Sequence, residues 1–147
     1  LTAIFRRKLG LTVEQTDDLK LIEAFLSWMQ KNKKDYTITF RDFTKDPDSL
    51  FDDAEGKTWY EQYQRRLNLE QISPEKRKKM MAQANPKFIL RNYLAQEAIQ
   101  DAEKSDFTRL IKLLEVLKNP YAENPEFDDF AKAPPEWGKK LEISCSS

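Results

Sequence analysis

The chain has 147 residues, with 25 Lys plus Arg, 25 Asp plus Glu and no His, so its formal net charge at pH 7 is zero. A balanced charge provides no overall field that would attract nucleic acid or an anionic membrane. Charged residues make up 34% of the chain and only 3 residues are glycine, which is typical of helices with solvated charged faces. We therefore expect an all-α protein with no nucleic-acid partner and no membrane partner.

The single cysteine argues against a secreted scaffold held together by disulfides. No apolar run reaches the length of a transmembrane helix, and no signal peptide is visible. The sequence thus predicts a soluble, intracellular protein. It begins at Leu1 inside a helical pattern, which suggests a fragment of a longer chain.

The first part of the chain predicts three helices. Residues 1–9 have a helical pattern that Gly10 closes. Thr16 is the expected N-cap of a helix ending in the lysine-rich residues 31–34. The apolar stripe of this second helix consists of Leu19, Ile22, Phe25, Leu26 and Met29. Residues 35–43 fit a helix or a strand equally well; because no second strand is available for pairing, we expect a helix.

Residues 44–56 are expected to connect this region to a helix over about 55–69. The inward side chains of that helix should be Trp59, Tyr60, Tyr63 and Leu67. Ser73 is the expected N-cap of the next helix, with Pro74 at its first position, and the helix should continue through residues 80–82.

Asn85 and Pro86 repeat this signal and predict the longest helix, extending to about Lys104. Asp106 is expected to cap the last helix, which Asn119 and the following proline should end. The patterns together predict about six helices over a domain of residues 1–119.

Residues 120–147 contain four prolines and no helical stripe, so they predict an extended tail. Aromatic residues are rare in disordered segments and favour a tail that docks on another surface. Those of the tail are Tyr121, Phe127, Phe130 and Trp137.

The composition provides no self-sufficient active site. Without His, a Cys-His or Ser-His-Asp nucleophile and a His-ligated metal are excluded, and three scattered glycines cannot form a phosphate-binding loop. We expect the paired acids at 17–18, 52–53 and 128–129 to be solvated helix caps rather than a cation site. The basic run 75–79 should be a solvated helix face, although it could contact phosphate groups.

Cys145 is the candidate redox residue. A lone thiol cannot form an internal disulfide, and a residue so near the carboxyl terminus is rarely buried. From this residue alone, a redox role and a thiol without any function are about equally favoured.

Several motifs occur in a characteristic order: Lys8-Leu9-Gly10-Leu11, Asp35-Tyr36-Thr37-Ile38-Thr39-Phe40-Arg41, Asn85-Pro86-Lys87-Phe88-Ile89-Leu90-Arg91-Asn92-Tyr93-Leu94-Ala95, Pro134-Pro135-Glu136-Trp137 and Ser144-Cys145-Ser146-Ser147. With these motifs, nearly the whole chain resembles the carboxyl-terminal region of the selenoprotein O (YdiU) family. The cysteine third from the end makes the resemblance specific.

The resemblance implies an all-helical domain of a kinase-like protein that transfers AMP from ATP, with Mg²⁺ or Mn²⁺, onto Ser, Thr or Tyr hydroxyls of other proteins. The family's nucleotide-binding and metal-binding residues lie in an upstream kinase-like core, and none maps onto residues 1–147. This segment should thus hold no catalytic, cofactor-binding or metal-binding residue. Its implied partners are its own core and the protein substrates of the parent chain.

In many animal members of that family a selenocysteine occupies the position of Cys145, which is consistent with redox control or with a disulfide to the core. Cysteine at this position favours a bacterial, cytoplasmic protein over a mitochondrial one. We interpret the segment as structural support for the core, with Cys145 as a redox residue. The alternative is a non-enzymatic helical module that binds a partner protein. Nucleic-acid binding through residues 76–79 is the weakest hypothesis, because the net charge is zero.

Overall fold

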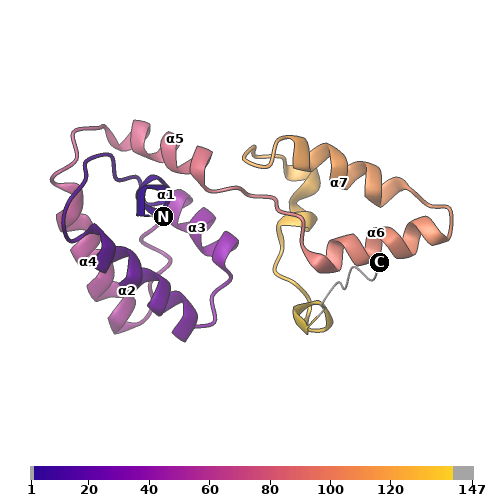
Figure 1. The fold of residues 1–147 in the computed structure, drawn as a ribbon, viewed down its shortest axis with the longest axis horizontal. Coiled ribbons are helices and arrows are strands. Elements are labelled where there is room, and N and C mark those ends of the chain that lie inside the picture. Colours follow the sequence, from indigo (N-terminus) through magenta and orange to yellow (C-terminus); the bar gives the residue numbers. More distant parts are fainter. Residues whose placement is uncertain (1, 141–147) are drawn as a thin grey trace. The chain divides into compact units, whose positions relative to one another are not determined.

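The computed structural model describes residues 2–140 of the chain, and every regular element in that range is a helix. This confirms the all-α prediction, including the choice of helix over strand for residues 35–43. The chain divides into two compact units, one ending at Pro86 and the other beginning at Lys87 (Figure 1). None of the described helices combines the length and the apolar composition that crossing a bilayer requires.

Five α-helices form the first unit. They are α1 (Thr2–Lys8), α2 (Asp18–Lys31), α3 (Tyr36–Lys45), α4 (Ala54–Leu67) and α5 (Pro74–Ala84). Side-chain caps begin three of them: Asp35, Asp53 and Ser73 each accept a hydrogen bond from a backbone N–H three residues later. The predicted cap at Ser73 is confirmed, whereas α2 has Asp17 rather than Thr16 at its N-cap position.

Gly10 ends the first helical segment, as predicted, with a φ of +72° that an L side chain rarely adopts. A Cβ at this position would lie 2.5 Å from Arg77 Cγ and 2.8 Å from Met81 Sδ, both on α5. Gly10 therefore serves the turn and also allows the chain to approach α5 closely.

The core of the first unit is a single aromatic-rich cluster centred on Phe25, which is fully buried. Its ring stacks on Trp59 with centroids 4.4 Å apart and meets Phe40 edge-on at 5.3 Å. The polar atoms of the buried aromatics have partners: Trp59 Nε1 donates to Leu21 O and Tyr63 Oη to Leu9 O, both at 2.8 Å. The prediction that Trp59 and Tyr63 belong to the core is confirmed.

The second unit is a helical hairpin supported by two short 3-10 helices. Its elements are α6 (Asn92–Glu103), α7 (Thr108–Lys118), η1 (Pro125–Ala131) and η2 (Glu136–Lys140). The apolar interior consists of two small clusters. One contains Tyr93, Leu94, Ala98 and Leu113, and the other Phe88, Val116 and Phe127.

The predicted helix from Pro86 to about Lys104 is wrong in its first turns, because α6 begins only at Asn92. The backbone N–H groups of Lys87 and Phe88 both donate to Pro120 O, at 2.8 and 3.1 Å. Phe88 is thereby placed in the core, 1% exposed, and its burial outweighs the helix-start signal of the proline. With 12 residues, α6 is also shorter than α2 and α4, which have 14 each.

Near the start of α7, Phe107 rather than Asp106 occupies the N-cap position. Asp106 still accepts a hydrogen bond from Thr108 N at 3.0 Å, so the predicted capping group acts from one residue earlier. Beyond Pro120, the two 3-10 helices interrupt the predicted extended segment. Phe127 packs into its own unit, while Trp137 contacts Tyr93 edge-on at 6.1 Å and is half exposed.

Candidate functional site

Cys145, the candidate redox residue, lies outside the described residues. Among residues 2–140, no group of His, Cys, Asp or Glu side chains has an arrangement that could hold a metal ion. Buried polar networks around Arg66 and Asn85, and a polar cavity beside Arg109, bring polar side chains together within residues 2–140.

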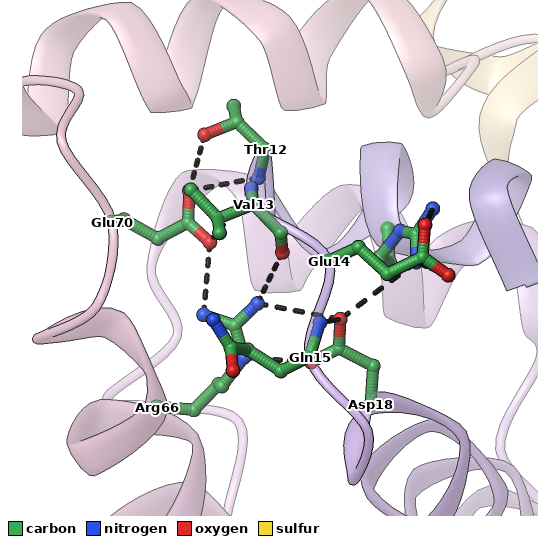
Figure 2. A network of polar contacts seen from close by, with 8 residues as sticks. Thr12, Val13, Glu14, Gln15, Asp18, Arg66 and Glu70 are labelled. Carbon is green, nitrogen blue, oxygen red and sulfur yellow. Dashed lines mark hydrogen bonds and ion pairs between the residues drawn. The ribbon is translucent and has the colours of Figure 1, made fainter.

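The most extensive network surrounds Arg66, near the end of α4 (Figure 2). Its guanidinium lies between the carboxylates of Asp18 and Glu70, whose side chains are each only 1% exposed. Arg66 Nε donates to Asp18 Oδ1 at 2.6 Å, and Nη1 donates to Glu70 Oε1 at 2.9 Å. Nη2 donates to Val13 O at 2.6 Å. Because four of its contacts are already to protein oxygens, this arginine has little donor capacity left for a phosphate ligand.

The same two carboxylates hold the loop between α1 and α2. Glu70 accepts hydrogen bonds from the backbone N–H of Thr12 at 2.8 Å and of Val13 at 3.3 Å, and from the Thr12 hydroxyl. Asp18 Oδ2 accepts one from Gln15 N at 3.0 Å. Figure 2 shows these loop residues and Arg66 converging on the two acids. The network fixes an irregular segment to the end of α4.

Hydrogen bonding sets the protonation of Glu70. Burial alone would raise its pKa, but the hydrogen bonds from Thr12, Arg66 and Val13 outweigh burial and hold the pKa below its usual value. The pKa of Arg66 is raised in turn, since its bonds to Asp18 and Glu70 outweigh the effect of burial. Both Glu70 and Arg66 are thus ionised at neutral pH and form an ion pair.

A second buried network is built around Asn85, which is fully buried at the end of α5. Its side-chain amide donates to Lys8 O at 2.8 Å and to Thr44 Oγ1 at 2.9 Å. Arg41 Nη1 donates to the backbone carbonyl of Asn85 at 2.9 Å. The network joins α1, α3 and α5, so Asn85 ends α5 and links it to two other helices rather than starting a helix.

The acidic pairs of the sequence do not form a cation site. Asp53 is a helix cap, as predicted, and it also accepts a hydrogen bond from Trp28 Nε1 at 2.7 Å. The prediction of a solvated cap is wrong for Asp18, which is buried beside Arg66. Asp128 pairs with Lys87 at 2.6 Å, and Asp129 with Lys132 at 2.6 Å.

The basic run of α5 agrees with the prediction of a solvated helix face. Lys76, Lys78 and Lys79 are exposed, and Arg77 is half-buried. Met81 of the same helix is 4% exposed and belongs to the core.

The second unit has polar cavities beside Arg109 and an apolar cavity. One polar cavity has a volume of about 310 Å³ and another about 330 Å³; Arg109 lines both and pairs with Asp101 at 2.8 Å and with Glu97 at 2.9 Å. The apolar cavity, of about 210 Å³, lies between α6 and α7 and is lined only by Leu, Ile and Ala side chains. The polar cavity of about 310 Å³ is lined in part by Thr108, whose side chain is hydrogen-bonded to the carboxylate of Asp106, whereas the lining of the apolar cavity has no polar side chain.

A sequence model described as "Protein adenylyltransferase SelO" matches residues 1–118, which is more than half of the chain. The chain belongs to the SelO family. The match extends through both buried networks and ends at the last residue of α7. The polar networks of Arg66 and Asn85 both lie within this SelO-family region.

Curated SelO-family relatives cover almost the whole chain. A protein named "Protein nucleotidyltransferase YdiU" from Yersinia pseudotuberculosis serotype O:1b is 46% identical over 151 residues, covering 97% of this chain and 31% of the relative. Proteins of the same name from Vibrio parahaemolyticus and Pseudomonas fluorescens are 44% and 43% identical, covering 98% of this chain and 32% of each relative. The chain thus spans about a third of the length of the relatives it matches.

Proposed function

We propose that this chain is the helical supporting region of a larger SelO-family enzyme that transfers AMP from ATP to Ser, Thr or Tyr hydroxyls of proteins. The observation that carries the proposal is the family match over residues 1–118, together with relatives about three times as long as the matched region. A free-standing interaction module is not favoured, because the match is to an enzyme family.

The described residues suit support better than chemistry. Transfer of AMP forms a bond from the acceptor hydroxyl oxygen to the α-phosphorus of ATP and releases pyrophosphate. The family's chemistry implies ATP and a divalent cation for the larger protein. Within residues 2–140 no group of acidic side chains has an arrangement that could hold such a cation, and Asp18, Asp53 and Asp128 are engaged in ion pairs or a helix cap, which supports placing the metal and the nucleotide outside this part of the chain.

Cys145 is proposed as a redox residue of the same enzyme. A thiolate is the reactive form of cysteine, and an accessible one can form a disulfide with a second cysteine by losing two electrons to a cellular oxidant. The proposal for Cys145 rests on its position in the sequence and on the family resemblance. The bacterial cytoplasm, expected from the sequence, stays a prediction that the bacterial sources of the relatives support.

Transfer of label from α-labelled ATP to protein tests the function. The full-length enzyme is expected to label protein, whereas residues 1–147 alone should not. Comparison of the wild type with Cys145→Ser under reducing and oxidising conditions then tests the redox role. Labelling that oxidation changes only in the wild type would support it; labelling indifferent to oxidation would remove the redox role and keep the enzyme. Absence of labelling by the full-length protein would contradict the proposed activity.

A further inference from the structure

An exposed groove lies between α6 and α7, and we infer that it is an intramolecular docking site. Its lining has no charged or polar side chain, and it consists of Leu90, Ala95, Ala98, Ile99, Ala102, Leu110, Leu113, Leu114 and Leu117. Several of these side chains point into water; Leu90 is 58% exposed and Leu114 is 57% exposed. A contiguous apolar surface of this kind usually marks a place where another surface packs.

The groove continues outward from the interior of its own unit: Ala98 and Leu113 belong to the interior cluster and also form the buried floor of the groove. On α6, Tyr93 and Leu94 face the interior, whereas Ile99 lines the groove. On α7, Val116 packs against Phe88 and Phe127, whereas Leu114 lines the groove. An amphipathic helix needs only its inward-facing apolar residues to fold onto a core. Ile99 and Leu114, on the outer edges of the groove, are about half exposed within the described part of the chain.

The composition of the groove indicates a permanent partner. Surfaces that associate only transiently are about as polar as the rest of a protein, whereas permanent interfaces are more apolar and exclude charge from their centre. Here the charged side chains of α7, such as Lys112 and Glu115, lie outside the lining. The groove thus resembles one half of a protein core.

We propose that the groove is covered by the part of the same polypeptide that lies outside residues 1–147, through an amphipathic helix. This inference rests on the proposed function, and it names the surface by which the supporting region holds the rest of the enzyme. The relatives provide the chain length for such a partner, because about two thirds of their sequence lies outside the matched region. A helix with apolar residues at every third or fourth position fits the channel between two antiparallel helices.

The test places a charge in the groove of the full-length protein, with Leu114→Lys and Ile99→Lys as separate variants. Leu19→Lys is the matched control, because Leu19 is a helical residue of similar exposure, 50%, in the first unit. Thermal unfolding and molecular mass by light scattering are measured for each variant. Hydroxyl-radical footprinting of the wild type compares oxidation of Leu90 and Leu114 in the full-length protein and in residues 1–147.

Both groove variants are expected to lower the melting temperature of the full-length protein by several degrees, because a lysine would be buried without a partner. Leu19→Lys should leave it nearly unchanged, and footprinting should show Leu90 and Leu114 protected only at full length. In residues 1–147 alone, Leu114→Lys and Ile99→Lys should leave the helix content unchanged, because these side chains already contact water.

Groove variants that melt like Leu19→Lys, with no protection at full length, would overturn the inference. A wild-type dimer that the groove variants convert to monomers would also overturn it, since the occupant would then be a second copy. Transfer of AMP is measured on the same wild-type protein. If the wild type transfers AMP but the groove variants keep its melting temperature, only the inference about the groove is removed. If the groove variants melt at a lower temperature but the wild type does not transfer AMP, the groove is supported and the proposed activity is removed.

Discussion

The two units of the chain bury their apolar residues to very different degrees. In the first unit, rings from α2, α3 and α4 pack around Phe25, and two polar networks connect the helix ends and loops to one another. In the second unit the interior is split into two small clusters, and most of the large exposed apolar side chains among the described residues belong to it. The difference indicates that the first unit contains its own stabilising contacts, whereas the second depends on a surface outside itself.

Phe127→Ala should have the largest effect and should act on the second unit alone. Phe127 is 3% exposed and links η1 to Phe88 and Val116, so removing its ring leaves a cavity that costs about 4 kcal/mol. A small interior has few other contacts to compensate. Hydrogen exchange of the amides of α7, in residues 1–147, measures the loss.

The matched control is Phe107→Ala, which removes a 52% exposed ring beside the same helix. Its cost should be below about 0.5 kcal/mol. Near-ultraviolet circular dichroism from the buried Trp28 and Trp59 should report an unchanged first unit in both variants. Loss of that signal in Phe127→Ala would show that the two units unfold together, and it would contradict the view that each unit has a stability of its own.

Arg66→Met should destabilise the first unit by about 3 kcal/mol, because two buried carboxylates would lose their common cation. Urea unfolding followed by the fluorescence of Trp28 and Trp59 measures the change. Arg65→Met is the control on the same helix, since Arg65 is 71% exposed and pairs with Glu61, whose side chain is similarly exposed. Equal losses for the two variants would contradict a structural role of the buried network.

Asn85→Ala should cost about 2 kcal/mol, since Lys8 O and Thr44 Oγ1 would each lose a hydrogen bond from a fully buried amide. Because these bonds join α1, α3 and α5, the loss should appear as faster exchange of amides in all three helices. Gln83→Ala, at an exposed position of the same α5, serves as the control. Faster exchange confined to α5 would mean that Asn85 stabilises only its own helix end.

The sequence predicted the helices of the first unit well, because their signals are local. Ser73 with Pro74 and the glycine at position 10 act within a few residues, and the structure has a helix start and a helix end there. The start of α6 could not be predicted in this way, since the placement of Phe88 depends on Val116 and Phe127, far along the chain. A long-range contact therefore overrode a local signal.

The polar networks likewise could be predicted from the sequence only where their contacts are local. Arg66 and Glu70 are four residues apart, a spacing that indicates a helical ion pair, so half of that network had a visible sequence signal. The contact of Arg66 with Asp18 spans 48 residues and left no such signal, and Asp18 was expected to be a solvated cap. The position of the groove could not be predicted from the sequence, because it depends on the pairing of α6 with α7.

The smallest expected effect is the pH dependence of the stability of the first unit. The folded-state pKa of Glu70 is below that of the unfolded chain, so its contribution to stability is present at neutral pH and is lost as the pH falls through the folded pKa. Urea unfolding should thus show that the unfolding free energy of the wild type falls between neutral and acidic pH, and that it falls less in Glu70→Gln. Glu61→Gln, at an exposed position of α4, should keep the wild-type slope. If Glu70→Gln leaves the acid loss unchanged, the charge of Glu70 does not couple the loop at Thr12 to α4.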